Sequence, residues 1–432
     1  MLRSNFPSGM HWFFIQVKLQ WFAMDEARIN TVAILGSLDT KGEECQFMRD
    51  TLLKQGIHSV IIDSGTLGRP LIAGNICREE VAAKAGVDLG DLVKTGDKGK
   101  IIQTMTLGLT ACVLDLYKQD RIQGIIAIGG GQGTAMGTAA MKILPIGFPK
   151  VVVSTIASGN MRPYLETQDI AVFPSVTDMF GINFVLERIL ENAVSALAGM
   201  VRNSRPLVKG TRRVIGGTAF GVVTTGLMKL KAMFQGLGFE MILFHATGVG
   251  GIAMEYMAEK GYFDGVIDWA THEIVDEVGN GIFSPGKSRL DILSKVEIPY
   301  IIAPGAIDYI VQGPFVELSN YWQKRNHIIH NRNITLVRAT RSEMVRAAKF
   351  LATKVNRALK PVKILIPLRG FSEPNFKGKS FYDPETDRMF IKSLKRYLTD
   401  ASQVIEIDAH INDEYFVQQG FKQMVSMLER EN

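Results

Sequence analysis

Residues 125–134 read IIAIGGGQGT, an apolar run that breaks into a glycine-rich turn before an alanine-rich segment. The apolar run predicts a buried strand and the alanine-rich segment predicts a helix, so the glycines form the turn between them. Such a turn presents several backbone N–H groups at the positive end of a helix dipole, where phosphate or carboxylate binds well. We therefore predict an anion site here, with a nucleotide phosphate as the expected ligand.

The spacing of these glycines matches neither of the two best-known phosphate motifs. No lysine follows Gly133, so the Walker pattern is missing, and Thr134 stands where the dinucleotide-binding pattern requires its third glycine. A second interpretation therefore stays open, in which the glycines only let the helix pack tightly against the sheet.

The sequence on either side of the turn alternates short apolar strands with longer helical segments. Strands rich in β-branched residues and separated by helices are typical of an α/β fold, with a parallel sheet covered on both faces. For the first half we predict strands at 31–36, 59–63, 125–128 and 151–155, and helices at 41–55, within 78–119 and at 181–202.

The same pattern restarts after a polar, basic segment, and a chain of 432 residues is long for a single core. We predict a first domain at 30–204, a linker at 205–213 and a second domain at 214–432. Each half places a glycine-rich turn after a strand, and in the second half this turn is 246–251. The second domain has expected strands at 214–221, 239–245, 265–268, 299–303, 334–337, 362–366 and 404–407, and expected helices at 222–237 and 252–260.

Composition limits the class of protein and its partners. Apolar residues make up 46% of the chain and charged residues 21%, which is typical of a globular protein with an ample core. The net charge is +6, but no block of lysine and arginine occurs, so we expect anionic small molecules as partners and not nucleic acid. The three cysteines form no Cys-x-x-Cys pair, so neither a disulfide framework nor a zinc cluster is indicated, and a cytoplasmic location fits.

Residues 1–29 are expected to be an extension to the first domain. Their aromatic and aliphatic residues are interrupted by Gln16, Lys18 and Gln20, so the run is too short to span a bilayer and resembles no cleaved leader. We expect translation to begin at Met24, or the extension to be disordered. The alternative is an anchor on a membrane surface.

Polar residues that follow strands are the next candidates, because ligands in open parallel sheets bind beyond the carboxyl ends of strands. Asp39 or Thr40 is placed to cap the helix after the first strand, and Lys41 is placed to offer a positive charge to a phosphate. An ordinary cap with a solvated lysine is the alternative. The small, hydroxyl-rich segment 156–160 follows another strand and would let a ligand approach closely.

Eight motifs in a fixed order carry a resemblance to a known family. From about residue 30 to its C-terminus, the chain resembles the uncharacterised bacterial and plant family that includes the N-terminal, ATP-binding domain of the tomato mosaic virus resistance protein. The motifs are DTKG at 39–42, the glycine turn with AAM at 139–141, VSTIASG at 153–159, FHATGVGG at 244–251, PGAID at 304–308, HN with NIT within 330–335, FYDPE at 381–385 and HIND at 410–413.

This resemblance implies two Rossmann-like domains with mainly parallel sheets covered by helices, a nucleotide pocket in the first domain, and a homodimer. The ATP contacts that it implies are Asp39, Thr40, Lys41, Gly130, Gly131, Gly133, Thr134, Thr155, Ser158 and Gly159. The chain departs from the family pattern in the glycine turn, which reads GGGQGT where the family commonly has GGSGGT, and at 309–314, which read YIVQGP where the family usually has MVNFGP. Gln132 would narrow the phosphate seat or contact the ligand itself.

The second domain offers a further group of polar candidates at its strand ends. A histidine with carboxylates in a cleft would serve proton transfer or hold magnesium. None of the seven histidines has a strong metal-binding spacing, so a structural role is the alternative for each. The candidates are His245, Thr247, Gly248, Gly250, Gly251, Glu273 and Asp308.

Two functions from different classes follow from these residues and the resemblance. The first is a cytoplasmic ATP-binding protein, with magnesium as a further candidate cofactor, that acts as an ATP-dependent transferase or ligase on a small acid. The second is a nucleotide-dependent regulatory or binding module without turnover. A third, weaker hypothesis is an enzyme that acts on a small phosphorylated or carboxylated metabolite without using ATP.

Overall fold

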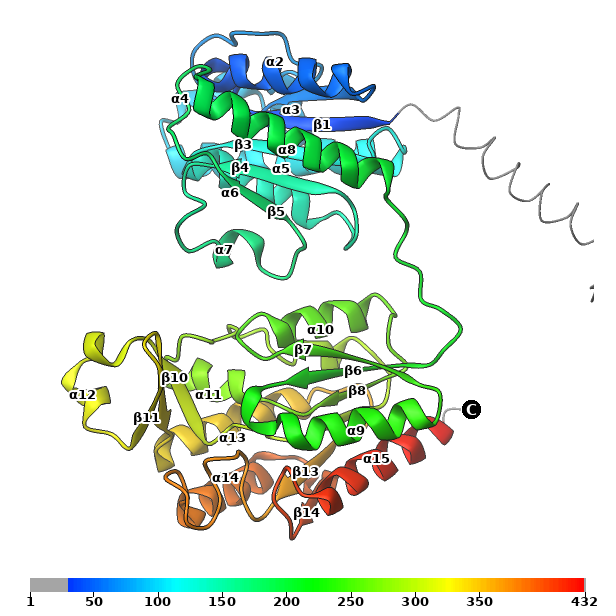
Figure 1. Ribbon diagram of the computed structural model, residues 1–432, viewed down its shortest axis with the longest axis vertical. Coiled ribbons are helices and arrows are strands. Elements are labelled where there is room, and N and C mark those ends of the chain that lie inside the picture. The colour runs from blue at the N-terminus through cyan, green and yellow to red at the C-terminus, as the bar shows by residue number, and fades with distance from the viewer. Residues whose placement is uncertain (1–29, 431–432) are drawn as a thin grey trace, which may run out of the picture. The chain divides into compact units, whose positions relative to one another are not determined.

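The computed structural model describes residues 30–430, so the predicted extension at 1–29 and its start at Met24 lie outside the described residues. The chain divides into two compact units between Leu207 and Val208, a point that falls within the 205–213 segment. Both units are built from parallel sheets flanked by helices, which confirms the α/β fold predicted from the sequence (Figure 1).

The first unit is a five-stranded parallel sheet in the order β2-β1-β3-β4-β5. The edge strand β5 was not predicted, because four residues that end in a proline give too short a pattern. The strands are β1 (Thr31–Gly36), β2 (His58–Asp63), β3 (Gly124–Gly129), β4 (Lys150–Ser154) and β5 (Ala171–Pro174). The helices are α2 (Leu38–Lys54), α3 (Arg78–Lys84), α4 (Leu89–Lys94), α5 (Lys98–Lys118), α6 (Gly131–Lys142), α7 (Arg162–Leu165) and α8 (Phe184–Arg202).

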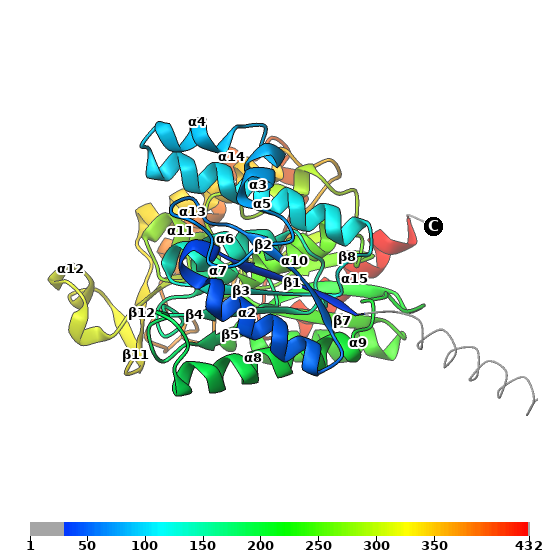
Figure 2. The same cartoon turned by 90° about the horizontal axis from the view of Figure 1, so that it is seen from above.

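Helices cover both faces of this sheet because successive strand residues point to opposite sides. In β1, Val32 and Ile34 pack in one core with α2 and α8, whereas Ala33 and Leu35 pack in another core with α3 to α6. Figure 2 shows α2 and α8 on one side of the strands and α3 and α5 on the other. The central positions of the strands are therefore apolar, and the polar residues lie at or next to the strand ends.

The second unit has a six-stranded parallel sheet in the order β14-β13-β9-β8-β6-β7 and a separate antiparallel sheet in the order β10-β12-β11. The strand expected at 334–337 lies in the small antiparallel sheet, and strand patterning alone does not say which sheet a strand joins. The strands are β6 (Val214–Ala219), β7 (Glu240–His245), β8 (Gly265–Asp268), β9 (Tyr300–Ile302), β10 (Tyr309–Gln312), β11 (His327–Asn331), β12 (Ile334–Arg338), β13 (Lys363–Pro367) and β14 (Val404–Ile407). The helices are α9 (Thr224–Gly236), α10 (Gly250–Glu259), α11 (His272–Gly279), α12 (Asn320–Gln323), α13 (Arg341–Val355), α14 (Pro384–Tyr397) and α15 (Glu414–Glu429).

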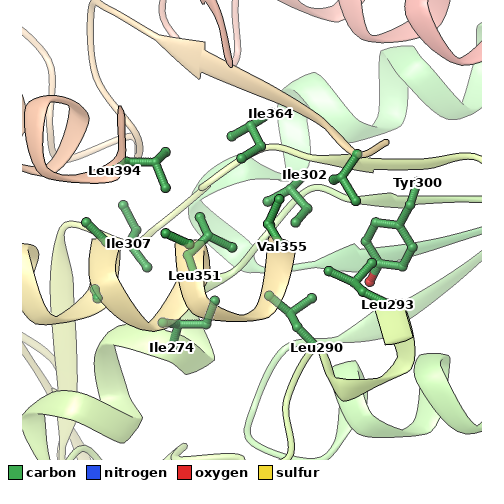
Figure 3. Close-up of a cluster of buried hydrophobic side chains, with 14 of the residues drawn as sticks. Ile274, Leu290, Leu293, Tyr300, Ile302, Ile307, Leu351, Val355, Ile364 and Leu394 are labelled. Carbon is green, nitrogen blue, oxygen red and sulfur yellow. The ribbon is translucent and has the colours of Figure 1, made fainter. Parts of the chain in front are cut away.

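The core of the second unit is also split between two sheet faces. One face packs against α10, α11, α13 and α14, and the other against α9 and α15. Figure 3 shows part of the first of these cores, in which Leu351 and Val355 of α13 lie in the same cluster as Ile302 of β9 and Ile364 of β13. Within residues 30–430, no helix combines the length and the apolar character that a membrane crossing requires.

Both sheets reverse their direction of winding next to their first strand. In the first unit, β2 lies on one side of β1, and β3 and the later strands lie on the other. In the second unit, β7 lies on one side of β6, and β8 and the later strands lie on the other. The loops after β1 and β3, and those after β6 and β8, therefore lead away to opposite faces, and such a point favours a ligand crevice.

Candidate functional site

The glycine turn joins β3 to α6 as the sequence predicted. Gly130 is the N-cap of α6, and the first helical hydrogen bond is donated by the Thr134 backbone N–H to the Gly130 oxygen at 2.8 Å. The N–H groups of Gly131, Gln132 and Gly133 precede that bond, so the helix ladder does not use them. They are the donors that an anion at this helix end would take.

The glycines of the turn fall into two classes when a Cβ atom is placed on each. At Gly129 it would lie 2.9 Å from the Gly133 Cα, and at Gly133 it would lie 2.9 Å from the Ile128 oxygen. At Gly131 it would meet nothing within 4 Å. Gly129 and Gly133 therefore allow close packing of helix on strand, whereas Gly131 borders open space, and the anion site stays a prediction there.

A cavity of about 330 Å³ opens at this turn, at the β1/β3 reversal of the sheet. It brings together two groups of predicted residues that are about 90 positions apart in the sequence, the loop after β1 and the glycine turn. The loop after β2 forms part of its wall, which the sequence analysis did not predict. The lining residues are Ser37, Asp39, Thr40, Lys41, Thr66, Leu67, Ile128, Gly129, Gly130, Gly131, Gln132 and Gly133.

Lys41 lines the cavity, but its ammonium group has a protein partner. Its Nζ donates to the backbone oxygen of Met179 and lies 5.1 Å from the centre of the Phe180 ring. The backbone of α2 departs from helical geometry at Lys41, with φ −128° and ψ 19°, which turns the side chain toward this segment. Lys41 therefore joins the cavity to the loop that follows β5.

A buried ion pair holds the wall that comes from the loop after β2. Asp63 ends β2, and its Oδ1 accepts the backbone N–H groups of Leu38 at 3.0 Å and Gly65 at 2.8 Å. Its Oδ2 lies 2.9 Å from Nε of the buried Arg78, which also donates to the Leu67 oxygen at 2.7 Å. The available sequence signal was Asp63 itself, a carboxylate directly after a strand.

Four of the predicted ATP contacts do not line the cavity. Thr134 is fully buried, and its hydroxyl shares a 2.6 Å hydrogen bond with that of Ser154 at the end of β4. Thr155 donates its backbone N–H to the Gly129 oxygen at 3.3 Å, and this hydrogen bond holds the start of the turn against the end of β4. Ser158 and Gly159 lie on an exposed turn outside the lining.

The glycine turn of the second unit is closed by a carboxylate of the same chain. Glu273 Oε1 accepts the backbone N–H of Gly248 at 2.7 Å and that of Gly251 at 3.4 Å, at the start of α10. A Cβ at Gly251 would lie 2.1 Å from Glu273 Oε2, and one at Gly250 would lie 1.8 Å from the His245 oxygen. These glycines make room for buried groups, and Glu273 occupies the place that an external anion would take.

Arg289 connects this turn to two more buried carboxylates. Its Nε lies 2.9 Å from Glu273 Oε2, one terminal nitrogen lies 2.7 Å from Asp268 Oδ2, and the other bonds to Glu255. Burial raises the pKa of Glu255 to about 7, against the opposing effect of Arg289. Arg289 thus joins three carboxylates from different parts of the second unit in one buried cluster.

The other polar candidates of the second unit, His245, Thr247 and Asp308, contact residues outside that cluster. His245 is exposed and stacks on Phe220, with ring centres 5.5 Å apart, and the Thr247 hydroxyl donates back to the His245 oxygen at 3.4 Å. Asp308 is fully buried, with one oxygen accepting the Ser372 hydroxyl at 2.8 Å, and burial raises its pKa.

His272, the first residue of α11, is a further buried polar group of the second unit. Both side chains are fully buried, and His272 Nε2 lies 3.5 Å from Asp276 Oδ2. Burial acts to lower the pKa of His272, but the Asp276 and Glu273 carboxylates and the Ala306 backbone together outweigh it, so that pKa is raised. Among residues 30–430, no cluster of three or more histidine, cysteine or acidic side chains is arranged to hold a metal ion.

Two doubly wound parallel sheets, with an open glycine turn in the first and a closed one in the second, define a two-domain Rossmann-like α/β protein. The chain belongs to the Uncharacterised protein family (UPF0261): residues 30–206 match its N-terminal domain and residues 212–428 its C-terminal domain. This confirms the resemblance that the sequence motifs indicated.

Relatives occur in bacteria and in plants. A UPF0261 protein of Clostridium tetani is 41% identical over 400 residues, which cover 92% of this chain and 99% of that protein. The ToMV resistance protein Tm-1(GCR237) of Solanum lycopersicum is 36% identical over 326 residues, which cover 74% of this chain and 43% of the tomato protein. Among solved structures, MurG of Acinetobacter baumannii aligns over 92% of this chain and all of that one, with 12% identity and a TM-score of 0.20, which is too low to inform function.

Proposed function

We propose that the first domain of this protein binds ATP through the cavity at the carboxyl end of its sheet. The observation that carries the proposal is the 330 Å³ cavity in which the loop after β1 faces the unused N–H groups at the start of α6. Those N–H groups suit the phosphate oxygens, and Lys41 adds a positive charge at the same rim. The family resemblance supports ATP as the nucleotide.

Magnesium fits this site as an ion held jointly by the phosphates and one carboxylate. Asp39 is the acidic residue of the lining, and its Oδ2 accepts the Leu67 backbone N–H at 3.2 Å, which leaves acceptor capacity on the group. Magnesium commonly binds through one or two carboxylates together with substrate phosphates. Asp39 would therefore hold the ion, and the bound ion would neutralise phosphate charge.

The test is thermal stabilisation by ATP with magnesium. A ligand present at about 100 times its Kd stabilises the folded state by about 2.7 kcal/mol. We expect wild-type protein to show this shift, Lys41→Ala to show a smaller one at the same ATP concentration, and Lys54→Ala to match wild type. Lys54 is an exposed lysine in the last turn of the same helix, so it controls for loss of charge alone. No shift in wild type at millimolar ATP would refute the proposal.

A second assay separates an enzyme from a regulatory module. An ATP-dependent transferase or ligase would consume ATP in the presence of one small carboxylic acid from a panel, and a regulatory module would bind ATP without consuming it. The lining favours the module, because Asp39 is its one acidic residue and it contains no histidine to act as a base. A homodimer and a cytoplasmic location stay part of the proposal, and sedimentation and cell fractionation test them.

A further inference from the structure

The loop between β5 and α8 carries an exposed aromatic ring beside the proposed ATP site. Phe180 is 85% exposed, and Val176 and Phe184 on the same segment are 79% and 84% exposed. Phe180 differs from the other two because its ring lies beside Lys41, a residue that lines the cavity. The question is what the Phe180 ring contacts when the site is filled.

This loop is held in place on both sides of Phe180 although the ring itself is not packed. The Lys41 ammonium donates to the Met179 oxygen, and Glu44 Oε1 accepts the Gly181 backbone N–H at 3.2 Å. Val176 has a φ of 61°, a left-handed conformation that is strained for a β-branched residue. The fold therefore positions the loop against α2 and leaves Phe180 projecting.

Lys41 places the ring at the edge of the cavity. Its side chain lines the cavity, and its Nζ lies 5.1 Å from the ring centre, over one face of the phenyl group. With 85% of Phe180 exposed, the opposite face of the ring is open. The lining residues themselves include no aromatic side chain, so a planar group that extends from the cavity would find its stacking surface on Phe180.

We propose that Phe180 stacks on the base of the bound nucleotide, so that the site recognises a nucleoside triphosphate and not a phosphate chain alone. This inference rests on the proposed ATP site. The glycine turn holds the phosphates, Lys41 spans the two parts of the site, and the phenyl ring covers the base. Stacking uses the π-face that every base has, so adenine and guanine nucleotides bind with similar affinity.

The test compares nucleotide binding with binding of the phosphate chain alone. Isothermal titration with ATP, GTP and inorganic tripolyphosphate is carried out on wild type, Phe180→Ala and Phe184→Ala. Loss of a stacked base weakens binding by roughly 10-fold or more, so we expect Phe180→Ala to lose that much affinity for ATP and GTP without losing affinity for tripolyphosphate. Phe184→Ala, an equally exposed control at the first residue of α8, keeps wild-type affinities.

The remaining outcomes distinguish this inference from the proposed function. Wild type that binds neither ATP nor tripolyphosphate removes the ATP site itself. Wild type that binds ATP, with Phe180→Ala binding it equally well, removes only the role of Phe180. Leu67 also lines the cavity and is 63% exposed, so Leu67→Ala is a third variant, and selective loss of ATP binding there would place the base against Leu67 instead. Phe180 is too exposed for its truncation to unfold the domain, and unchanged melting temperatures verify this.

Discussion

At the scale of single residues, glycine has two different functions within one turn. Gly131 borders open space at the start of α6, whereas Gly133 is in contact with the strand that precedes it. A side chain added at Gly131 would enter open space, where it would obstruct a bound ligand. A side chain added at Gly133 would collide with the strand that precedes the turn. The motif therefore contains open and packed positions that its letters do not distinguish.

Valine at each position separates these functions. We expect Gly131→Val to keep the wild-type free energy of unfolding within about 1 kcal/mol and to weaken ATP binding. We expect Gly133→Val to lose about 1–3 kcal/mol of stability, because its Cβ would press on the Ile128 oxygen. Urea denaturation and ATP titration measure the two effects. Equal stability losses in both variants would contradict this division.

At the scale of elements, the two glycine turns differ in what lies at the helix start. The N–H groups at the start of α6 face a cavity, whereas those at the start of α10 donate to the Glu273 carboxylate. An internal carboxylate satisfies the helix end as an external phosphate would. The second-unit glycines stay predicted site residues, and the N–H groups of Gly248 and Gly251 have Glu273 as their partner in this structure.

Removing Glu273 tests this role. Glu273→Ala leaves Arg289 short of one partner and frees the N–H groups of Gly248 and Gly251, so we expect a loss of about 3–5 kcal/mol. Glu259→Ala is the matched control, because Glu259 pairs with Lys295 at 3.3 Å on the surface and such pairs contribute at most about 1 kcal/mol. Guanidinium denaturation compares the two variants. Similar losses in both would show that Glu273 is not a structural ligand.

Element prediction succeeded where patterns are long and periodic. The strand that leads into the glycine turn and the helix at 181–202 were both predicted, because each buries a continuous or regularly spaced apolar set. The short edge strand β5 was missed, and the sequence did not separate the antiparallel sheet of β10, β11 and β12 from the main sheet. Pairing partners depend on contacts between distant segments, which local patterns do not encode.

At the scale of the whole molecule, the two units have separate sheets and separate cores. Separate cores favour separate unfolding transitions. The tryptophans make the transitions distinguishable: Trp269 and Trp322 lie in the second unit, and the other two fall in residues 1–29. A chain that begins at Met24 therefore reports only the second unit by tryptophan fluorescence.

We expect saturating ATP to move only the first unit's transition. At about 100 times its Kd, the 2.7 kcal/mol of stabilisation corresponds to roughly 5–10 °C for a domain of this size. Circular dichroism should show that shift, and the tryptophan transition should stay where it is. A tryptophan transition that moves equally would mean that the units unfold together or that ATP binds the second unit.

The α/β class, the order of most strands of the two parallel sheets and the position of both glycine turns follow from the sequence, because apolar periodicity and glycine act over a few neighbouring residues. Which of the two turns faces a cavity does not follow from the sequence. Glu273 closes the second turn from more than 20 residues away in the sequence. Thr66 and Leu67, in the loop after β2, form part of the cavity wall at the first turn. Only the folded chain brings these groups together, because hydrogen bonding and burial depend on distance in space and not on separation in sequence.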